Sequence, residues 1–247
     1  RGSIEFKNYF ILIIGTVLVR SCGCIINDIN DYKFDRLVSR TKNRPLASGK
    51  MGMTEAWLYF ILLATLSLCL LFFVPLYTIY ASLVVAVFIM IYPLTKRFLK
   101  APQFFLGITF GSGTIISFSL VSSDFSLSLL ILFIGTVLWI ISFDTIYAFE
   151  DIADDLKIGI NSTPILWGDQ ALNISKYLHL AFYVSLALIG FINEFSSFFL
   201  LVLIILLGLY IHQRRLINND QYLDAFKFNN WIGMFASMGF VIEAFLI

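Results

Sequence analysis

The stretch "YFILIIGTVLVRSCGCIINDINDYKFD", residues 9–35, joins two opposite kinds of sequence. Its first part, Tyr9–Ile26, is mostly apolar with Arg20 as its one charged residue, and is long enough to cross about 30 Å of hydrocarbon as a helix. Its last part, residues 27–35, contains three aspartates. An acidic segment directly after a membrane-length apolar run predicts a helix that continues past the membrane surface and carries carboxylates there.

The rest of the chain shares the apolar character of this first run. Hydrophobic residues make up 59% of the 247 residues and charged residues only 13%, whereas about a quarter of the residues in a soluble domain are charged. We therefore expect an all-α, polytopic transmembrane helical bundle that forms one domain over residues 1–247. Eight segments have the length and composition of membrane spans: Tyr9–Ile26, Ala56–Val74, Tyr77–Leu94, Phe104–Val121, Leu127–Phe143, Ile174–Ile192, Ser196–His212 and Phe228–Ile247.

The distribution of basic residues orients these spans. Fourteen of the 17 Lys and Arg lie in the segments 27–53, 94–103, 144–176 and 212–227, so the positive-inside rule places these four segments in the cytoplasm. Both chain ends then lie on the other side of the membrane. Because the chain begins with an arginine rather than a methionine, we expect that its N-terminal segment is missing.

The acidic residues are clustered on the same side as the basic ones. Eight of the 16 Asp and Glu fall within two windows, residues 27–35 and 144–155. If the first helix continues through its window, Asp28, Asp31 and Asp35 share one face, with Asn27 one turn before Asp31. The first window therefore predicts several oxygen ligands on one side of a helix.

The second window, "DTIYAFEDIADD", repeats this arrangement on a predicted continuous helix. Asp144, Asp151 and Asp155 then lie on one face, with Tyr147 and Asp154 close to it. Carboxylates held this close repel one another unless a cation lies between them, and hard oxygen ligands favour Mg²⁺. The alternative is that both windows are solvated, acidic helix ends.

A magnesium ion held by carboxylates usually also binds phosphate oxygens, which favours a phosphate-bearing substrate. A lipid diphosphate suits both the charges and the location, because its tail can lie among the Phe-rich helices. The positive-inside rule alone would also place cations here. Basic residues that follow the windows or end a nearby helix are Lys33, Arg36, Arg40, Lys42, Arg44, Lys50, Lys96, Arg97 and Lys157.

Four blocks of sequence together carry a resemblance to a known family. They are "NDINDYKFDRLVSRTKNRPLASG" at 27–49, "YPLTKR" at 92–97, "APQ" at 101–103 and "DTIYAFEDIADDLKIGINSTPILWG" at 144–168. In this order they resemble the UbiA family of membrane prenyltransferases, and most closely its bacterial members that prenylate 4-hydroxybenzoate in ubiquinone biosynthesis. The chain departs from the usual pattern at Ile152 and Ala153, where a charge pair is common, and at Asn161, where a Lys is common.

The resemblance implies a bundle of nine helices around a central cavity open to the cytoplasm, of which this chain would contain eight and a first helix would precede Arg1. It further implies a polyprenyl diphosphate donor, 4-hydroxybenzoate as the acceptor and Mg²⁺ as the cofactor. The metal site would consist of Asn27, Asp28, Asp31, Asp35, Asp151, Asp154 and Asp155. The substrates would be bound by Arg20, Lys33, Arg44, Lys96, Arg97 and Lys157.

Three residues are candidates for catalysis. Arg97, which matches the Arg of the family's YPxxKR block, would contact the acceptor carboxylate through its planar guanidinium, although it also suits a lipid-headgroup anchor. Tyr147 would stabilise an allylic carbocation with its ring face, and Asp144 would polarise the phenol. The RTKNRPLASG segment, residues 40–49, would form a lid that excludes water from the reaction.

Other interpretations stay open. The acceptor could be another aromatic such as a naphthoate, a homogentisate or haem. A secondary transporter would instead use acidic residues near the bilayer midplane. We expect membrane lipid around the protein, a location in the bacterial inner membrane, no nucleic-acid partner and no obligate protein partner.

Some features need no substrate to explain them. Gly107 and Gly111 form a small-xxx-small pair that predicts a close helix contact. His179 is interpreted as a packing residue within a span. His212, Arg214 and Arg215 end another span, where cations suit the helix C-terminus and the lipid headgroups.

Overall fold

The computed structural model describes residues 6–246, and all regular structure in this range is helical. The helices are α1 (Phe6–Asp35), α2 (Met53–Leu70), α3 (Leu76–Thr95), α4 (Pro102–Gly111), α5 (Gly113–Ser119), α6 (Leu127–Ala148), α7 (Ile152–Ile158), α8 (Thr163–Trp167), α9 (Ala171–Ile192), α10 (Ser197–Asn218), α11 (Tyr222–Lys227) and α12 (Asn229–Leu246). Two single 3₁₀ turns, Leu71–Phe73 and Gly168–Gln170, follow α2 and α8.

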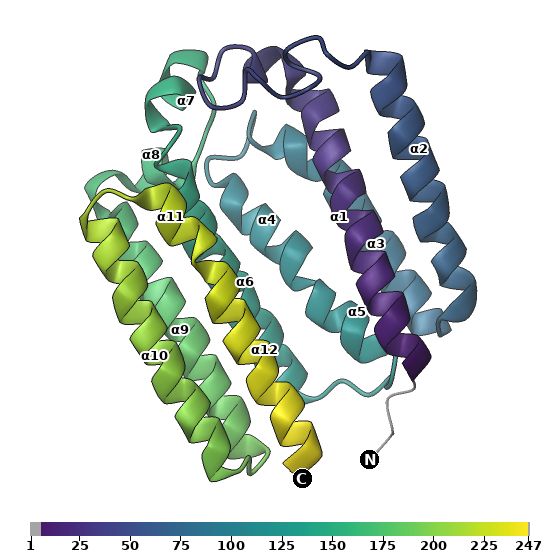
Figure 1. Cartoon of the computed structure of the whole chain (residues 1–247), viewed down its shortest axis with the longest axis vertical. Coiled ribbons are helices and arrows are strands. Elements are labelled where there is room, and N and C mark those ends of the chain that lie inside the picture. The colour runs from purple at the N-terminus through teal and green to yellow at the C-terminus, as the bar shows by residue number, and fades with distance from the viewer. Residues whose placement is uncertain (1–5, 247) are drawn as a thin grey trace.

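The long helices run up and down between two ends of a bundle (Figure 1). Helices α1, α3, α6 and α10 run toward one end, and α2, α4 with α5, α9 and α12 return. The connections 36–52, 96–101, 149–170 and 219–228 gather at the first end, which we call the loop end. The prediction that the four basic segments share one side is therefore confirmed, and α1 begins and α12 ends at the opposite side.

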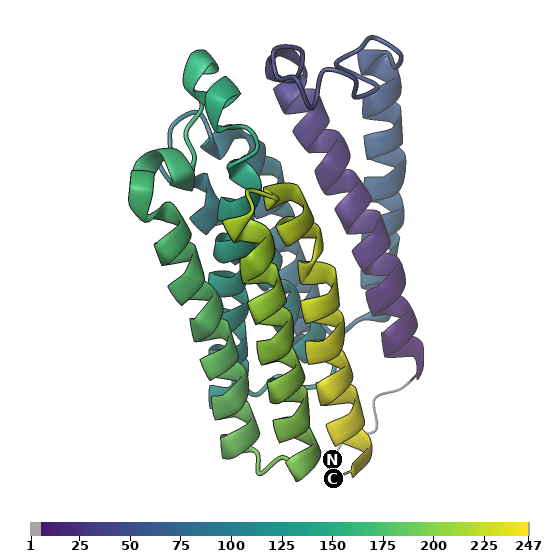
Figure 2. The ribbon, with the colours of Figure 1, turned by 60° about the vertical axis from the view of Figure 1, so that its left-hand side comes forward.

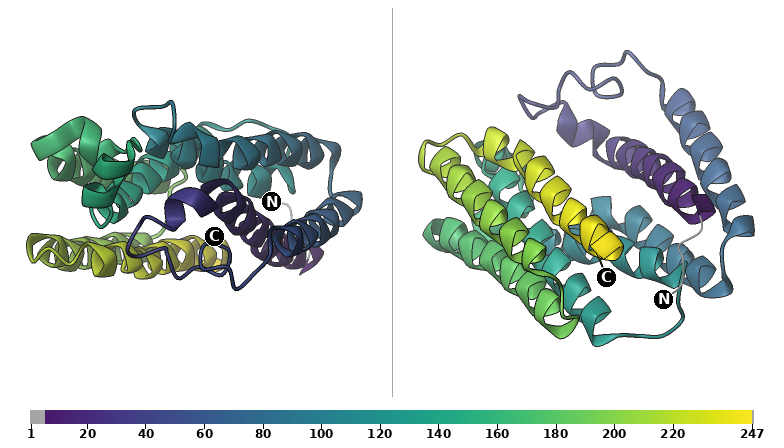
Figure 3. Two further views of the ribbon diagram at one scale, coloured as in Figure 1. Left: turned by 90° about the horizontal axis from the view of Figure 1, so that it is seen from above. Right: turned by 60° about the horizontal axis from the view of Figure 1, so that its bottom comes forward.

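The helices follow one another in space much as they do in sequence. Helix α6 packs against α4 on one side and against α9 on the other, while α1 packs against α2 and α3. The pair α1 and α2 lies on the far side of the molecule from α9 and α10 (Figure 2; Figure 3). The largest buried cluster joins α9, α10 and α12 through Phe182, Leu186, Val202, Leu206, Ile232 and Ala236.

Each of the eight predicted spans contains helix, but two differ from the prediction. In the described part of the chain, six helical segments are long and apolar enough to cross a membrane, which supports a multi-pass membrane protein. The predicted span Phe104–Val121 is divided into α4 and α5. The predicted span Phe228–Ile247 corresponds to α12, which begins with two asparagines, and its last residue lies outside the described residues.

The division between α4 and α5 has a local cause. Ser112 lies between two glycines, and its hydroxyl donates to the carbonyl of Ile108 at 2.7 Å. Glycine–serine pairs and serine bonds to the preceding turn both bend helices. The apolar run alone does not show this bend, so the sequence predicted one straight span.

The close helix contact predicted for Gly107 and Gly111 is confirmed. A Cβ atom added to Gly107 would lie 2.9 Å from Cγ1 of Ile141 and 3.1 Å from the carbonyl oxygen of Val137. A Cβ on Gly111 would lie 2.7 Å from Cγ2 of Val137. The two glycines thus let α4 approach the backbone of α6.

We expect Gly107→Val to lower the free energy of unfolding by about 1–3 kcal/mol, because the branched side chain would force α4 away from α6. Gly208→Val is the matched control, since a Cβ added to Gly208 meets no atom within 4 Å. Thermal unfolding of the purified variants in detergent measures the difference. Equal unfolding temperatures for the two variants would contradict the close contact.

Candidate active site

The first acidic window lies on the last turns of α1, as predicted. Nη1 of Arg44 lies 2.9 Å from Oδ1 of Asp28 and 3.0 Å from Oδ2 of Asp35, so one guanidinium joins two carboxylates seven residues apart. Asp31 is 5% exposed and pairs with Nζ of Lys96, at the end of α3, at 3.1 Å. The shared face is therefore present, and basic side chains compensate its negative charge.

The second window is not the continuous helix that the spacing predicted. Helix α6 ends at Ala148 and α7 begins at Ile152, so Asp144 and Asp155 lie on different helices. Contacts with α11 favour this turn: the ring of Phe149 stacks on Tyr222 with centroids 5.0 Å apart, and Oε1 of Glu150 accepts from the N–H of Leu223 at 2.8 Å. The prediction of one face at residues 144–155 is therefore wrong.

The loop 36–52 brings the two windows together. Arg40 holds the carboxylate of Asp151 with two groups, Nε at 3.0 Å from Oδ1 and Nη2 on Oδ2. The guanidinium carbon of Arg40 also lies 4.7 Å from the centroid of the Tyr147 ring. The backbone N–H of Ser39 donates to Oδ2 of Asp154 at 3.1 Å. Since Arg44 of the same loop holds the first window, this segment connects both.

Asp154 and Asp155 are adjacent but differ in their surroundings. The backbone N–H of Ser39 and the ammonium of Lys157 lower the pKa of Asp154. Burial raises the pKa of Asp155 to about 6, and the negative charge of Asp151 adds to this effect. Asp155 forms no ion pair with the residues that the structure describes. Its carboxylate is therefore available to a bound cation.

The donor set fits a hard divalent cation in its chemistry. Between residues 6 and 246, no three His, Cys, Asp or Glu side chains converge as a metal site, and Arg40, Arg44 and Lys96 pair with four of the carboxylates, those of Asp28, Asp31, Asp35 and Asp151. Oδ1 of Asn27 is buried and has no hydrogen-bond partner in the described residues, and Asp155 has no ion-pair partner there. A buried amide oxygen without a partner and an unpaired carboxylate are ligands that Mg²⁺ prefers.

The family model described as "UbiA prenyltransferase family" matches residues 1–239. The chain belongs to this family. It is 36% identical to the 4-hydroxybenzoate octaprenyltransferase of Coxiella burnetii strain CbuK_Q154, over 98% of this chain and 85% of the relative. The identity to the 4-hydroxybenzoate octaprenyltransferase of Vesicomyosocius okutanii is also 36%, over 98% of this chain and 90% of the relative.

Solved UbiA structures share the fold. A UbiA homologue from Aeropyrum pernix K1 in its apo form superposes with a TM-score of 0.85 at 23% identity, over 98% of this chain and 91% of that one. A homologue from Archaeoglobus fulgidus bound to GPP and Mg²⁺ superposes with a TM-score of 0.75 at 18% identity, over 97% of this chain and 89% of that one. The all-α architecture expected from the sequence is thus the UbiA fold.

The predicted substrate-binding residues of this UbiA protein are held in different ways. Nη2 of Arg97 donates to the carbonyl of Asn30 at 2.8 Å, and its guanidinium carbon lies 5.3 Å from the centroid of the Phe34 ring. The contact of Arg97 with an acceptor carboxylate stays a prediction. Lys33 is exposed, with its ammonium 5.9 Å from the centroid of the Tyr32 ring. The structure does not bring Lys33 into the ion pairs of the windows.

Two further predicted cations, Lys157 and Arg20, differ in their surroundings. Nζ of Lys157 is 3.3 Å from Oδ1 of Asp154, and its side chain is exposed. The guanidinium carbon of Arg20 lies 5.2 Å from the centroid of the Phe110 ring on α4. The side chain of Arg20 is exposed and forms no ion pair with the described residues, so its contact with a substrate stays a prediction.

The sequence did not single out three residues that support the UbiA site. Arg40 was one of several basic residues after the first window, and Ser39 contributes through its backbone, which has no sequence signal. Oε1 of Gln103 accepts from the N–H of Thr163 at 3.0 Å and so ties α4 to α8. The position of Gln103 within the "APQ" block was its one signal, and that block was used only for the resemblance.

Proposed function

We propose that this protein transfers a polyprenyl group from polyprenyl diphosphate to the ring of 4-hydroxybenzoate, ortho to the hydroxyl, in ubiquinone biosynthesis. Diphosphate is released. The observation that carries the proposal is the loop 36–52, in which Arg44 holds the first acidic window and Arg40 holds the second. Relatives named 4-hydroxybenzoate octaprenyltransferase, 36% identical over 98% of the chain, support the choice of donor and acceptor.

Magnesium is the proposed cofactor, in keeping with the Archaeoglobus fulgidus homologue bound to GPP and Mg²⁺. When bound, Mg²⁺ would neutralise the negative charge that grows on the departing diphosphate. In this chain the buried oxygen of Asn27 and the unpaired carboxylate of Asp155 are open to a ligand. The other proposed metal-site residues are Asp28, Asp31, Asp35, Asp151 and Asp154.

Three basic side chains are placed to change partner when the donor binds. Arg40, Arg44 and Lys96 each pair with an aspartate in the structure. A diphosphate offers them more acceptor oxygens, and guanidinium groups suit phosphate oxygens because two parallel N–H groups can donate. The same side chains then stabilise charge on the leaving group, which loosens the allylic C–O bond.

The acceptor half of the reaction rests on Asp144, Tyr147 and Arg97. The face of the Tyr147 ring already lies beneath the Arg40 guanidinium, which shows that it can face a cation, and an allylic carbocation is proposed to take that place. Asp144 would polarise the phenol so that its ortho carbon attacks, and Arg97 would hold the carboxylate. The ring proton then leaves to a base, and the loop 36–52 excludes water that would capture the cation.

The proposed location is the bacterial inner membrane, with the loop end in the cytoplasm and a central cavity opening there. The basic segments that gather at the loop end support this orientation. The transporter alternative is less well supported, because most of the clustered acidic residues lie in the loop-end turns of α1 and in α7 rather than at the middle of a span.

The test uses membranes that contain the protein, supplied with a polyprenyl diphosphate, Mg²⁺ and 4-hydroxybenzoate. We expect the prenylated acid as product, no product after chelation of the metal, and recovery when Mg²⁺ is added back. Parallel reactions with a naphthoate and with homogentisate examine the alternative acceptors. Turnover of one of these in place of 4-hydroxybenzoate would show that the proposed acceptor is wrong. The absence of product with every acceptor would show that the proposed reaction is wrong.

A further inference from the structure

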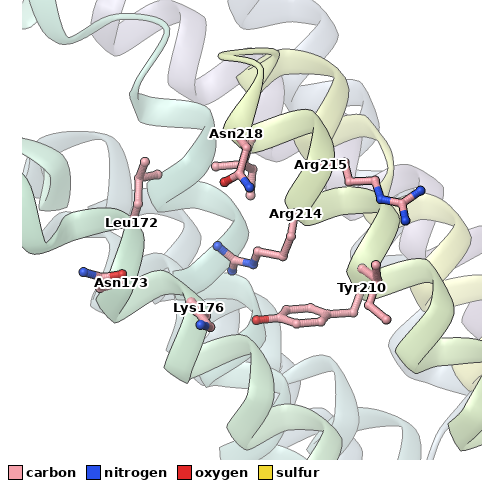
Figure 4. A pocket seen from close by; sticks show the side chains of 9 residues that line it. Leu172, Asn173, Lys176, Tyr210, Arg214, Arg215 and Asn218 are labelled. Carbon is pink, nitrogen blue, oxygen red and sulfur yellow. The ribbon is translucent and has the colours of Figure 1, made fainter.

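A cavity with several polar side chains in its lining lies between α9 and α10, on other helices than the aspartates (Figure 4). Its volume is about 450 Å³. None of the residues proposed for metal or substrate binding lines it. We call it the α9–α10 cavity, and its polar lining consists of Asn173 and Lys176 from α9 with Tyr210, Arg214, Arg215 and Asn218 from α10.

The charges that line this cavity are all positive. Lys176, Arg214 and Arg215 line it, the lining contains no carboxylate, and none of the three forms an ion pair in the described part of the chain. Figure 4 shows the guanidinium of Arg215 turned away from that of Arg214. Nε and Nη2 of Arg214 are buried and have no hydrogen-bond partner there. The guanidinium carbon lies 5.1 Å from the centroid of the Tyr210 ring, but because buried charged donors without hydrogen bonds are costly, an anion that accepts from these two nitrogens would stabilise the site.

Other donors in the cavity add to this demand. The hydroxyl of Tyr210 is also buried without a hydrogen-bond partner among the described residues. Leu172 and Asn173 near the start of α9 line the cavity, and so do Ile217 and Asn218 at the end of α10, so the positive end of one helix dipole and the negative end of the other both lie beside it. Figure 4 shows Arg214 and Tyr210 extending from α10 toward α9. Several hydrogen-bond donors thus line one cavity whose lining contains no carboxylate.

Anchoring to the membrane surface explains only part of this arrangement. The exposed Arg215 suits the C-terminal turn of α10 and the lipid headgroups, as the sequence predicted. A headgroup anchor keeps its charge in water or among headgroups, whereas two guanidinium nitrogens of Arg214 are buried. Headgroup anchoring therefore explains Arg215 but not the burial of Arg214 in the cavity.

We propose that the α9–α10 cavity is a second binding site that takes one phosphate group, separate from the proposed prenyl diphosphate site. A phosphate has several strong acceptor oxygens and can satisfy the guanidinium, the ammonium and the hydroxyl together. Its source is either the headgroup of an anionic phospholipid, since the cavity lies where the spans α9 and α10 begin and end at the loop end, or a free phosphate.

Native mass spectrometry of the purified protein in detergent tests the proposal. The probes are phosphatidylglycerol, phosphatidylcholine and inorganic phosphate. We expect one retained phosphate-bearing ligand, and about tenfold weaker retention in Arg214→Gln, because charge-assisted hydrogen bonds are lost. Lys100→Gln is the matched control: it removes one exposed positive charge from the loop end, outside the cavity, and should bind as the unmodified protein does.

Each outcome decides the proposal. Retention of phosphatidylglycerol over phosphatidylcholine, lost in Arg214→Gln, identifies a lipid headgroup, and retention of inorganic phosphate without phosphatidylglycerol identifies a free anion. If neither phosphatidylglycerol nor inorganic phosphate is retained, or if Arg214→Gln and Lys100→Gln retain the ligand equally, the proposed site is wrong. If Arg214→Gln does not fold, Arg214→Lys keeps the charge but loses the planar fork, and the comparison of the three probes on the unmodified protein still decides.

Discussion

Replacing Asp31 with asparagine is expected to reduce prenyl transfer by more than about a hundredfold. Substitution of a residue that merely supports a metal ligand lowers metal affinity or activity by about 10–100-fold, and substitution of a direct ligand should lower it further. Asp31 is 5% exposed, and its Oδ2 lies 3.1 Å from Nζ of Lys96, so its carboxylate is buried beside a cation. Initial rates in membranes with saturating donor, Mg²⁺ and 4-hydroxybenzoate measure the loss.

Asp224→Asn provides the control for this substitution. Asp224 also lies at the loop end, but it is exposed and its distance to Lys227 is 4.0 Å, at the limit for an ion pair. Such a surface pair contributes about 0–1 kcal/mol, so turnover should be unchanged. Unfolding temperatures of both variants separate a lost ligand from a lost fold. Unaltered turnover in Asp31→Asn would rule out the role that we assign to the first window.

Local pattern was sufficient for α1. Its apolar run and its acidic window lie on one uninterrupted helix, so the helical period places Asp28 and Asp35 on the same face, where Arg44 contacts both. The prediction for the second window was wrong because the geometry of that window depends on residues distant in the sequence. Phe149 and Glu150 contact α11, more than seventy residues later, and no pattern within residues 144–155 contains that information.

The sequence also could not show which of the basic residues pair with the carboxylates. All six Lys and Arg between residues 33 and 50 satisfy the positive-inside rule equally well. The turns of the loop 36–52 decide which of them reach a carboxylate: Arg40 and Arg44 do, whereas Lys33 is exposed beside Tyr32. The cavity around Arg214 escaped notice for the same reason, since burial of a guanidinium depends on how α9 and α10 pack.

Arg40→Gln is expected to lower kcat/KM by about ten- to a hundredfold, the range found when supporting residues of a metal site are changed. Arg40 is the only residue of the loop 36–52 whose side chain pairs with the second acidic window in the described structure. Glutamine can still donate one hydrogen bond, but it has neither the charge nor the two-pronged geometry. Lys42→Gln is the control in the same loop, because Lys42 is exposed and has no ion-pair partner in the described residues.

A double-mutant cycle with Asp151→Asn shows whether Arg40 acts through that carboxylate. If the pair works as a unit, the second substitution adds little to the first, and the two effects on kcat/KM differ from additivity by about 0.5–3 kcal/mol. Arg40→Lys should recover only part of the activity, because a lysine keeps the charge without the fork. Full additivity in the cycle would mean that Arg40 and Asp151 act separately, and the loop 36–52 would then not couple the two acidic windows.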